Sequence, residues 1–277
     1  MKKIIINHKP WQTRIAILAA DQLENIYFSA HAQTTLERAY FKSTVAKVLP
    51  GIQTAFIDIG QEKAGFLHIS EIDRDLALQR MSKTVQLEDD ESPQVGLPVK
   101  NPKSREKADI STILKEGDSL LVQVSKEPVY QKGAKLTTCF TIPGRFIVLM
   151  PNIPRVGISK KIAEREERVR LKGIVQKHLP AGMGAIIRTT SEERHESEIA
   201  KDVQFLLKTW QEIQEKYTAA QDKTEIFRDI DLCLQIVRDH LDNDVEEVIT
   251  DDKKNQSELY SFIRQIEPEL SHRVKLY

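Results

Sequence analysis

The stretch that decides the fold is LPGIQTAFIDIGQEKAGFLHISEI, from Leu49 to Ile72. Apolar and polar residues alternate on both sides of the segment IDIGQEKAG, which predicts two short antiparallel strands joined by a turn. Phe56 and Phe66 fall on these two strands, and a hairpin can bring such positions to the same face. Two interpretations stay open: either the rings are buried in a core, as phenylalanine mostly is, or they belong to a surface that holds a ligand.

Further strand-like segments lie on both sides of this hairpin. FKSTVAKVLP precedes it, and KEGDSLLVQVSK follows much later in the chain. Residues 73–109 are charged and lack periodicity, which predicts a long surface excursion inserted between strands. Phe41 to about Leu136 is therefore predicted to form one antiparallel unit of about five strands, a number that suits a small Greek-key barrel of the OB type.

The two ends of the chain have a different character. KKIIIN, TRIAIL and LENIYFS predict strands, and the chain after Pro154 mixes helical and strand patterns. A helix is predicted within ISKKIAEREERVRLKGIVQKHLP. A longer amphipathic helix follows in ESEIAKDVQFLLKTWQEIQEKY, with Phe205 on its apolar side. We expect the last strands to pair with the first ones, with the barrel and the middle section inserted between them.

Composition limits the classes of function. Lys and Arg together number 41, as do Asp and Glu, so a polyanionic partner must be met by a local patch. No apolar run approaches the ~18 residues of a membrane span, and the N-terminal apolar run is too short for a signal peptide. Cys139 and Cys233 form no CxxC pattern, so no zinc motif or disulfide framework is indicated and a cytoplasmic location is expected.

A second candidate site is IIRTT, Ile186 to Thr190, where a basic residue and two hydroxyls end a strand ahead of a helix. Such groups suit a phosphate. The alternative is an exposed arginine followed by a capping box from Thr190 to Glu193. PRVGISKKI, around Gly157, is either a loop that closes on an anion or a solvated helix start. No acid cluster, metal-ligand spacing or nucleophile motif indicates a catalytic residue.

Taken in order, VLPGIQTAFIDIGQEKAGFLHISEI, EGDSLLVQVSKEPVYQKGAKLTT, GRFIVLMPN, GISKKI and IIRTT resemble the ribonuclease E/G family, and its ribonuclease G branch most. The resemblance implies an α+β multidomain protein. Residues 1–35 plus 214–277 would form a discontinuous RNase H-like α/β domain. Residues 36–136 would form an inserted S1 (OB-type) RNA-binding domain with a long insertion at about 73–109, and residues 137–213 a 5′-sensor subdomain.

The resemblance also implies a substrate. Enzymes of the family cut single-stranded RNA with Mg²⁺ and favour a 5′-monophosphate. Their RNA-contacting S1 aromatics fall on Phe56 and Phe66, and their S1 lysine on Lys132. On this basis a role in RNA binding is favoured over burial for both rings.

The family's sensor positions fall on Arg188, Thr189 and, through its backbone, Val148. The guanidinium fork and the hydroxyl suit a terminal phosphate, whereas a bulkier triphosphate would not fit the same closed pocket. The chain departs from the family after Thr189, where TSEERHES replaces a Gly-containing loop. It also has Lys160 and Lys161 where the family carries arginine, and lysine lacks a bidentate fork.

The resemblance leaves the catalytic half unrepresented. The Mg²⁺-binding aspartates and the CPxC-type zinc link of the family have no counterpart in this sequence, so no Mg²⁺ site is predicted in this chain. We expect binding of single-stranded RNA with a 5′-monophosphate and little or no cleavage by the chain alone. Four explanations of the missing half stay open: a fragment, a split gene product, a decayed enzyme, or a second polypeptide that carries the catalytic half. A homo-oligomer is a further option for the partner of this chain. A non-catalytic RNA-binding regulator or adaptor is the alternative, and a purely structural protein would require both rings to be buried.

Overall fold

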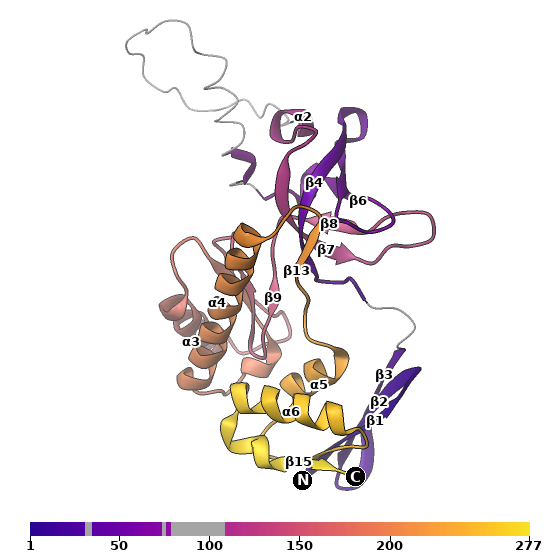
Figure 1. Ribbon diagram of the computed structural model, residues 1–277. Coiled ribbons are helices and arrows are strands. Elements are labelled where there is room, and N and C mark those ends of the chain that lie inside the picture. Colours follow the sequence, from indigo (N-terminus) through magenta and orange to yellow (C-terminus); the bar gives the residue numbers. More distant parts are fainter. Residues whose placement is uncertain (31–34, 74–75, 79–108) are drawn as a thin grey trace, which may run out of the picture.

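The computed structural model describes residues 1–30, 35–73, 76–78 and 109–277. The predicted excursion at 73–109 lies, except for residues 73, 76–78 and 109, outside the described residues. The chain is a mixed α+β protein with three sheets that follow one another along the molecule, the barrel at one end and both termini at the other (Figure 1). In the described part of the chain, no helix combines the length and apolarity of a membrane span.

One sheet joins the two ends of the chain. Its strand order is β15-β14-β1-β2-β3, and β1 pairs in parallel with β14 and antiparallel with β2. Helices α5 and α6 pack their apolar residues against the buried isoleucines of β1 and β2. The strands are β1 (Lys2–Lys9), β2 (Gln12–Ala19), β3 (Gln22–Ala30), β14 (Val245–Thr250) and β15 (Val274–Leu276), and the helices are α5 (Leu232–His240) and α6 (Lys253–Ile266). The expected pairing of first and last strands is therefore present.

The central stretch forms a closed five-stranded barrel, as predicted. Its strands pair in the order β4-β5-β6-β8-β7, and pairing of β4 with β7 closes it. Alternate side chains fill the interior, and α2 (Ile110–Ile113) contributes two buried isoleucines. The strands are β4 (Tyr40–Leu49), β5 (Thr54–Asp58), β6 (Gly65–His68), β7 (Ser119–Lys126) and β8 (Lys135–Thr137). A short later strand, β13 (Thr224–Phe227), extends this sheet beside β4.

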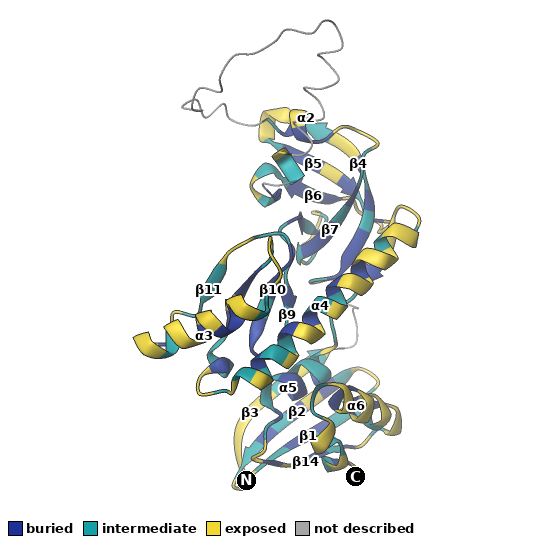
Figure 2. Cartoon of the chain, turned by 90° about the vertical axis from the view of Figure 1, so that its left-hand side faces the viewer, coloured by how far each residue is buried: buried dark blue, intermediate teal, exposed yellow. Residues whose placement is uncertain are grey.

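Between these two units lies a four-stranded sheet of order β11-β12-β10-β9. Helices α3 and α4 cover one face of it and turn their exposed sides to solvent (Figure 2). The strands are β9 (Ile142–Pro143), β10 (Ile147–Met150), β11 (Val156–Ile158) and β12 (Gly184–Ile187), and the helices are α3 (Arg165–His178) and α4 (Glu196–Ala219). Trp210 of α4 also contacts Tyr40 of the barrel, with ring centroids 6.4 Å apart, so the barrel and this sheet share a core.

Two local predictions and one open alternative, the cap at Thr190, are wrong. Phe205 is 37% exposed, because Val203, Leu206 and Trp210 form the buried stripe at helical spacing and Phe205 lies off it. The helix predicted from the ISKKI segment begins only at Arg165, because Val156–Ile158 pairs with β12 instead. Thr190 does not cap a helix; its hydroxyl donates to the Arg145 carbonyl at 2.5 Å.

The chain's predicted domain boundaries stay predictions. Helix α4 runs across the boundary placed at 213/214, and β8 runs across the one placed at 136/137.

Candidate nucleic-acid interface

Phe56 and Phe66 lie side by side on the outside of the barrel. In β5 the neighbouring Ala55 and Ile57 are fully buried, whereas Phe56 is 38% exposed. Phe56 is directly opposite Phe66 on β6, and the Phe66 side chain is half-buried. Directly opposed side chains of antiparallel strands have Cβ atoms about 5 Å apart. The interpretation that buries both rings is therefore wrong for Phe56, and the two aromatics form one continuous outer patch.

Two lysines extend this patch across neighbouring strands. Lys47 of β4 pairs with Phe56, and Lys135 of β8 pairs with Phe66. We call the four residues Lys47, Phe56, Phe66 and Lys135 the barrel row. Lys135 also forms an ion pair with Glu71. Aromatic rings between lysines are the combination on which bases stack while cations follow the phosphates.

Neither lysine of the barrel row was singled out from the sequence. Lys47 lies just after a β-bulge between Val45 and Lys47, which breaks the alternation that strand patterns rely on. Lys135 reaches the row only through the parallel pairing of β6 with β8, a contact between distant segments. The only signal in the sequence was a lysine in each of two predicted strands.

Lys132, the predicted S1 lysine, is exposed in the turn between β7 and β8 rather than in the row. This turn packs against the segment that leads into β6. A Cβ on Gly133 would lie 1.9 Å from the Ala64 carbonyl oxygen, and Lys63 Nζ donates to the Tyr130 carbonyl at 2.9 Å. Lys132 is therefore held at the end of the strand that carries Phe66.

Arg188 follows the last residue of β12, and its guanidinium is fixed. Nη1 and Nη2 donate to the two carboxylate oxygens of Asp239 at 2.9 and 2.7 Å, and Nη1 also donates to the Gly144 carbonyl at 2.5 Å. The hydrogen bond with Asp239 raises the pKa of Arg188. Burial alone would raise the pKa of Asp239, but hydrogen bonds from Arg188 and Arg238 outweigh it and the pKa is lowered.

Thr189 and Val148 lie close to Arg188 in the pairing register. Thr189 opens a short 3-10 turn, Thr189–Ser191, immediately after it. Val148 of β10 pairs with Ile186 of β12, which is 41% exposed on the sheet face that α3 and α4 do not cover. The Arg188 N–H donates to the Phe146 carbonyl at 2.8 Å, two positions from Val148. The structure thus brings the three predicted sensor residues to one end of this sheet.

A buried carboxylate holds the turn beneath this site. Asp202 of α4 accepts hydrogen bonds from the backbone N–H groups of Arg145, Phe146 and Ile147 at 3.1, 2.9 and 3.1 Å. Burial raises the pKa of Asp202, against the effect of these donors. Gly144 has no room for a side chain, because a Cβ there would lie 2.5 Å from an Asp202 oxygen. The carbonyl that receives Arg188 is therefore rigidly placed.

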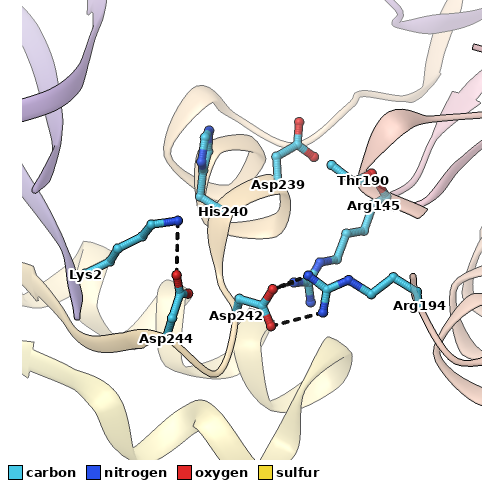
Figure 3. Close-up of a pocket in the computed structure, with 8 residues that line it drawn as sticks. All are labelled: Lys2, Arg145, Thr190, Arg194, Asp239, His240, Asp242 and Asp244. Carbon is cyan, nitrogen blue, oxygen red and sulfur yellow. Dashed lines mark hydrogen bonds and ion pairs between the residues drawn. The ribbon is translucent and has the colours of Figure 1, made fainter. Parts of the chain in front are cut away.

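An open hollow adjoins Asp239, the partner of Arg188, and is lined by paired charges (Figure 3). Arg194 binds Asp242 through both terminal nitrogens, and Lys2 pairs with Asp244 at 3.0 Å. The lining residues are Lys2, Arg145, Thr190, Arg194, Asp239, His240, Asp242 and Asp244. The cations of the hollow thus face carboxylates, as Arg188 does.

Within the described ranges, no three His, Cys, Asp or Glu side chains are grouped so as to hold a metal ion. Cys139 and Cys233 are both free thiols, and burial raises the pKa of Cys233 to about 12.

Comparison with known proteins gives the family of this chain. Residues 141–277 match the model of the Ribonuclease E/G family. Ribonuclease G of Haemophilus influenzae is 35% identical over 275 residues, which cover 99% of this chain and 52% of the relative. Ribonuclease G of Escherichia coli strain K12 is 32% identical over 99% of this chain and 53% of its own length.

The chain belongs to the ribonuclease E/G family. It is more similar to the ribonuclease G relative, because Ribonuclease E of Haemophilus influenzae is 31% identical, against 35% for Ribonuclease G of the same organism; the match to Ribonuclease E covers 100% of this chain and 28% of that relative. The chain spans about half the length of the ribonuclease G relatives that it matches. The family model covers α3, α4 and the C-terminal part of the shared sheet, while the pairwise matches to ribonuclease G extend over the barrel as well.

Proposed function

We propose that this chain is the RNA-binding and 5′-monophosphate-sensing portion of a ribonuclease G-like endoribonuclease that acts on single-stranded RNA. The observation that carries the proposal is the barrel row. Phe56 and Phe66 are opposed on the outer face of a closed barrel, with a lysine on each flanking strand. A purely structural barrel has no need of an exposed ring between cations, whereas single-stranded RNA offers a base to each ring and a phosphate to each lysine.

The sensing part of the proposal rests on Arg188, Thr189 and Val148. Arg188 remains charged at any accessible pH, and Thr189 follows it directly at the end of β12. A terminal phosphate would accept from both groups, and the pairing of Val148 with β12 would bring its backbone to the same pocket. We further propose that the pocket excludes a triphosphate by size.

Substitution of Arg188 tests this sensing role. We expect Arg188→Ala to narrow the preference for a 5′-monophosphate over a 5′-triphosphate on the same oligouridine, measured by fluorescence anisotropy at fixed salt. Arg170→Ala is the matched control, because Arg170 is also a paired arginine but lies on α3. An unchanged preference in Arg188→Ala would sink the sensor assignment.

We also propose a subdomain identity for two of the sheets. The sheet shared by the two chain ends, with α5 and α6 against it, supports an RNase H-like domain. The four-stranded sheet with α3 and α4 supports a 5′-sensor subdomain. The described residues do not fit the Mg²⁺ that the family resemblance implies, because among them no three His, Cys, Asp or Glu side chains are placed so as to hold a metal ion. The catalytic half is proposed to come from chain beyond these residues or from a second polypeptide.

A non-catalytic RNA-binding regulator is the second candidate. One observation favours it: the end of the Arg188 guanidinium is already occupied by Asp239. Such a protein would use the barrel row and bind RNA regardless of the 5′ end. Equal affinity of the wild-type chain for 5′-monophosphorylated and 5′-hydroxyl oligouridine would select this candidate over the first.

A further inference from the structure

The donors of Arg188 are divided between the protein and an open edge. A guanidinium carries five N–H donors in a planar fork. Three of them are used: Nη1 donates to Asp239 and to the Gly144 carbonyl, and Nη2 donates to Asp239. Among the described residues, no acceptor forms a hydrogen bond with Nε–H or with the second N–H of Nη2. These two donors lie on the same edge of the guanidinium and point in the same direction.

This division fixes how Arg188 can meet an anion. Asp239 and Gly144 hold the end and the far side of the guanidinium, which leaves the edge formed by Nε and Nη2. Two parallel N–H donors on one edge match two oxygens of a phosphate. The Arg188 side chain is 28% exposed, so this edge is not sealed in the core.

Asp239 is itself held in place. It lies in the last turn of α5, at the margin of the charged hollow on the side of Thr190 (Figure 3). Its Oδ1 also accepts from Arg238 Nε at 2.9 Å, and Arg238 donates onward to the Pro143 carbonyl at 2.8 Å. This contact ties α5 to the last residue of β9, so the orientation of Arg188 depends on both elements.

We infer that Asp239 is a positioning residue for 5′-phosphate recognition, because it turns the Nε–Nη2 edge of Arg188 toward the RNA 5′ end. This inference rests on the proposed function. Asp239 itself does not touch the phosphate. Its effect passes through Arg188, so it adds specificity for the 5′ end without adding to the affinity of the barrel row for RNA.

The test is a double-mutant cycle of Arg188→Ala and Asp239→Asn, which keeps the shape of the side chain but removes its charge. The probes are 5′-monophosphorylated and 5′-hydroxyl oligouridine of one length. We expect Asp239→Asn to lower the preference for the phosphorylated probe about tenfold, on the order seen for coupled charged neighbours. Binding of the 5′-hydroxyl probe should stay unchanged, and Asp239→Asn should have no effect in the Arg188→Ala background.

The outcomes separate the inference from the proposed function. If Arg188→Ala leaves the preference unchanged, the sensor assignment itself fails. If Arg188→Ala abolishes the preference and Asp239→Asn preserves it, only the positioning role fails. A loss of affinity for both probes in Asp239→Asn would show a general structural role and would also overturn the inference.

A measurement on the wild-type chain avoids any folding defect of the variant. The Arg188 Nε–H resonance, assigned from its absence in the ¹⁵N spectrum of Arg188→Lys, should shift on addition of 5′-monophosphorylated oligouridine and not on addition of the 5′-hydroxyl probe. A resonance that responds equally to both probes would contradict the open-edge geometry.

Discussion

Phe56 gives the sharpest test of the barrel row, because its contribution to folding can be matched elsewhere in the chain. Phe56 is 38% exposed and Phe205 of α4 is 37% exposed, so truncation of either ring removes a similar buried area. Complete burial of a phenylalanine contributes about 2.5 kcal/mol, so each alanine variant should lose about 1.5 kcal/mol of unfolding free energy. Urea unfolding would confirm that the two variants are equally destabilised.

Their RNA affinities should differ. Stacking of one base on an aromatic ring contributes about 1–3 kcal/mol, so Phe56→Ala should weaken binding of single-stranded RNA by about tenfold or more. Phe205→Ala should bind as the wild type does. The assay is fluorescence anisotropy with 5′-hydroxyl oligouridine at fixed salt, which removes any contribution from the 5′ end. Equal affinities for both variants would refute the assignment of the barrel row to RNA.

Two further predictions concern stability. Gly133→Ala should destabilise the barrel by more than about 1 kcal/mol, because its Cβ would lie 1.9 Å from the Ala64 carbonyl oxygen. Gly173→Ala should instead stabilise α3 by about 0.5–1 kcal/mol, because nothing lies within 4 Å of its Cβ, and urea unfolding of both variants checks the pair. Burial alone would raise the pKa values of Asp239 and Asp242, but their arginine partners lower them below the ordinary value of 3.8. The two ionised carboxylates therefore stabilise the folded state above pH 3.8, and this stabilisation is lost as the pH falls through their folded-state pKa values. The double variant Asp239→Asn/Asp242→Asn should accordingly lose less unfolding free energy than the wild type when the pH is lowered from about 5 to about 3. If thermal melts at the two pH values show the same loss of stability for the double variant and the wild type, this linkage is contradicted.

The barrel could be predicted because its signals are local. Alternation through Phe56 and Phe66, with a turn between them, specifies two paired strands wherever they lie in the fold. The same alternation put Phe56 on the opposite face from Ala55 and Ile57, which are buried. Which of these faces is the interior is a question of packing, and the sequence pattern left it open until the family resemblance was considered.

The environment of Arg188 could not be predicted in the same way. Its partner Asp239 lies 51 residues further along the chain on α5, and the Gly144 carbonyl that Arg188 binds lies 44 residues away in the other direction. Neither contact has a periodicity or a short motif. The bulge that precedes Lys47 is likewise a backbone irregularity with no signal in side-chain alternation.

The helix errors have a similar origin. The segment before Arg165 contains helix-forming residues, but Val156–Ile158 forms a strand that pairs with β12. The helix therefore begins only at Arg165. Tertiary pairing overrides local propensity at such places. By contrast, α6 begins at a local signal, since the Asp252 side chain before it accepts from the Asn255 N–H at 2.7 Å.

A crystal structure of the chain with 5′-monophosphorylated oligouridine tests the central claim most directly. The account predicts a phosphate on the Nε–Nη2 edge of Arg188 beside the Thr189 hydroxyl, with bases stacked on Phe56 and Phe66. RNA bound away from the barrel row, or a 5′-phosphate in the charged hollow with the open edge of Arg188 uncontacted, would contradict it.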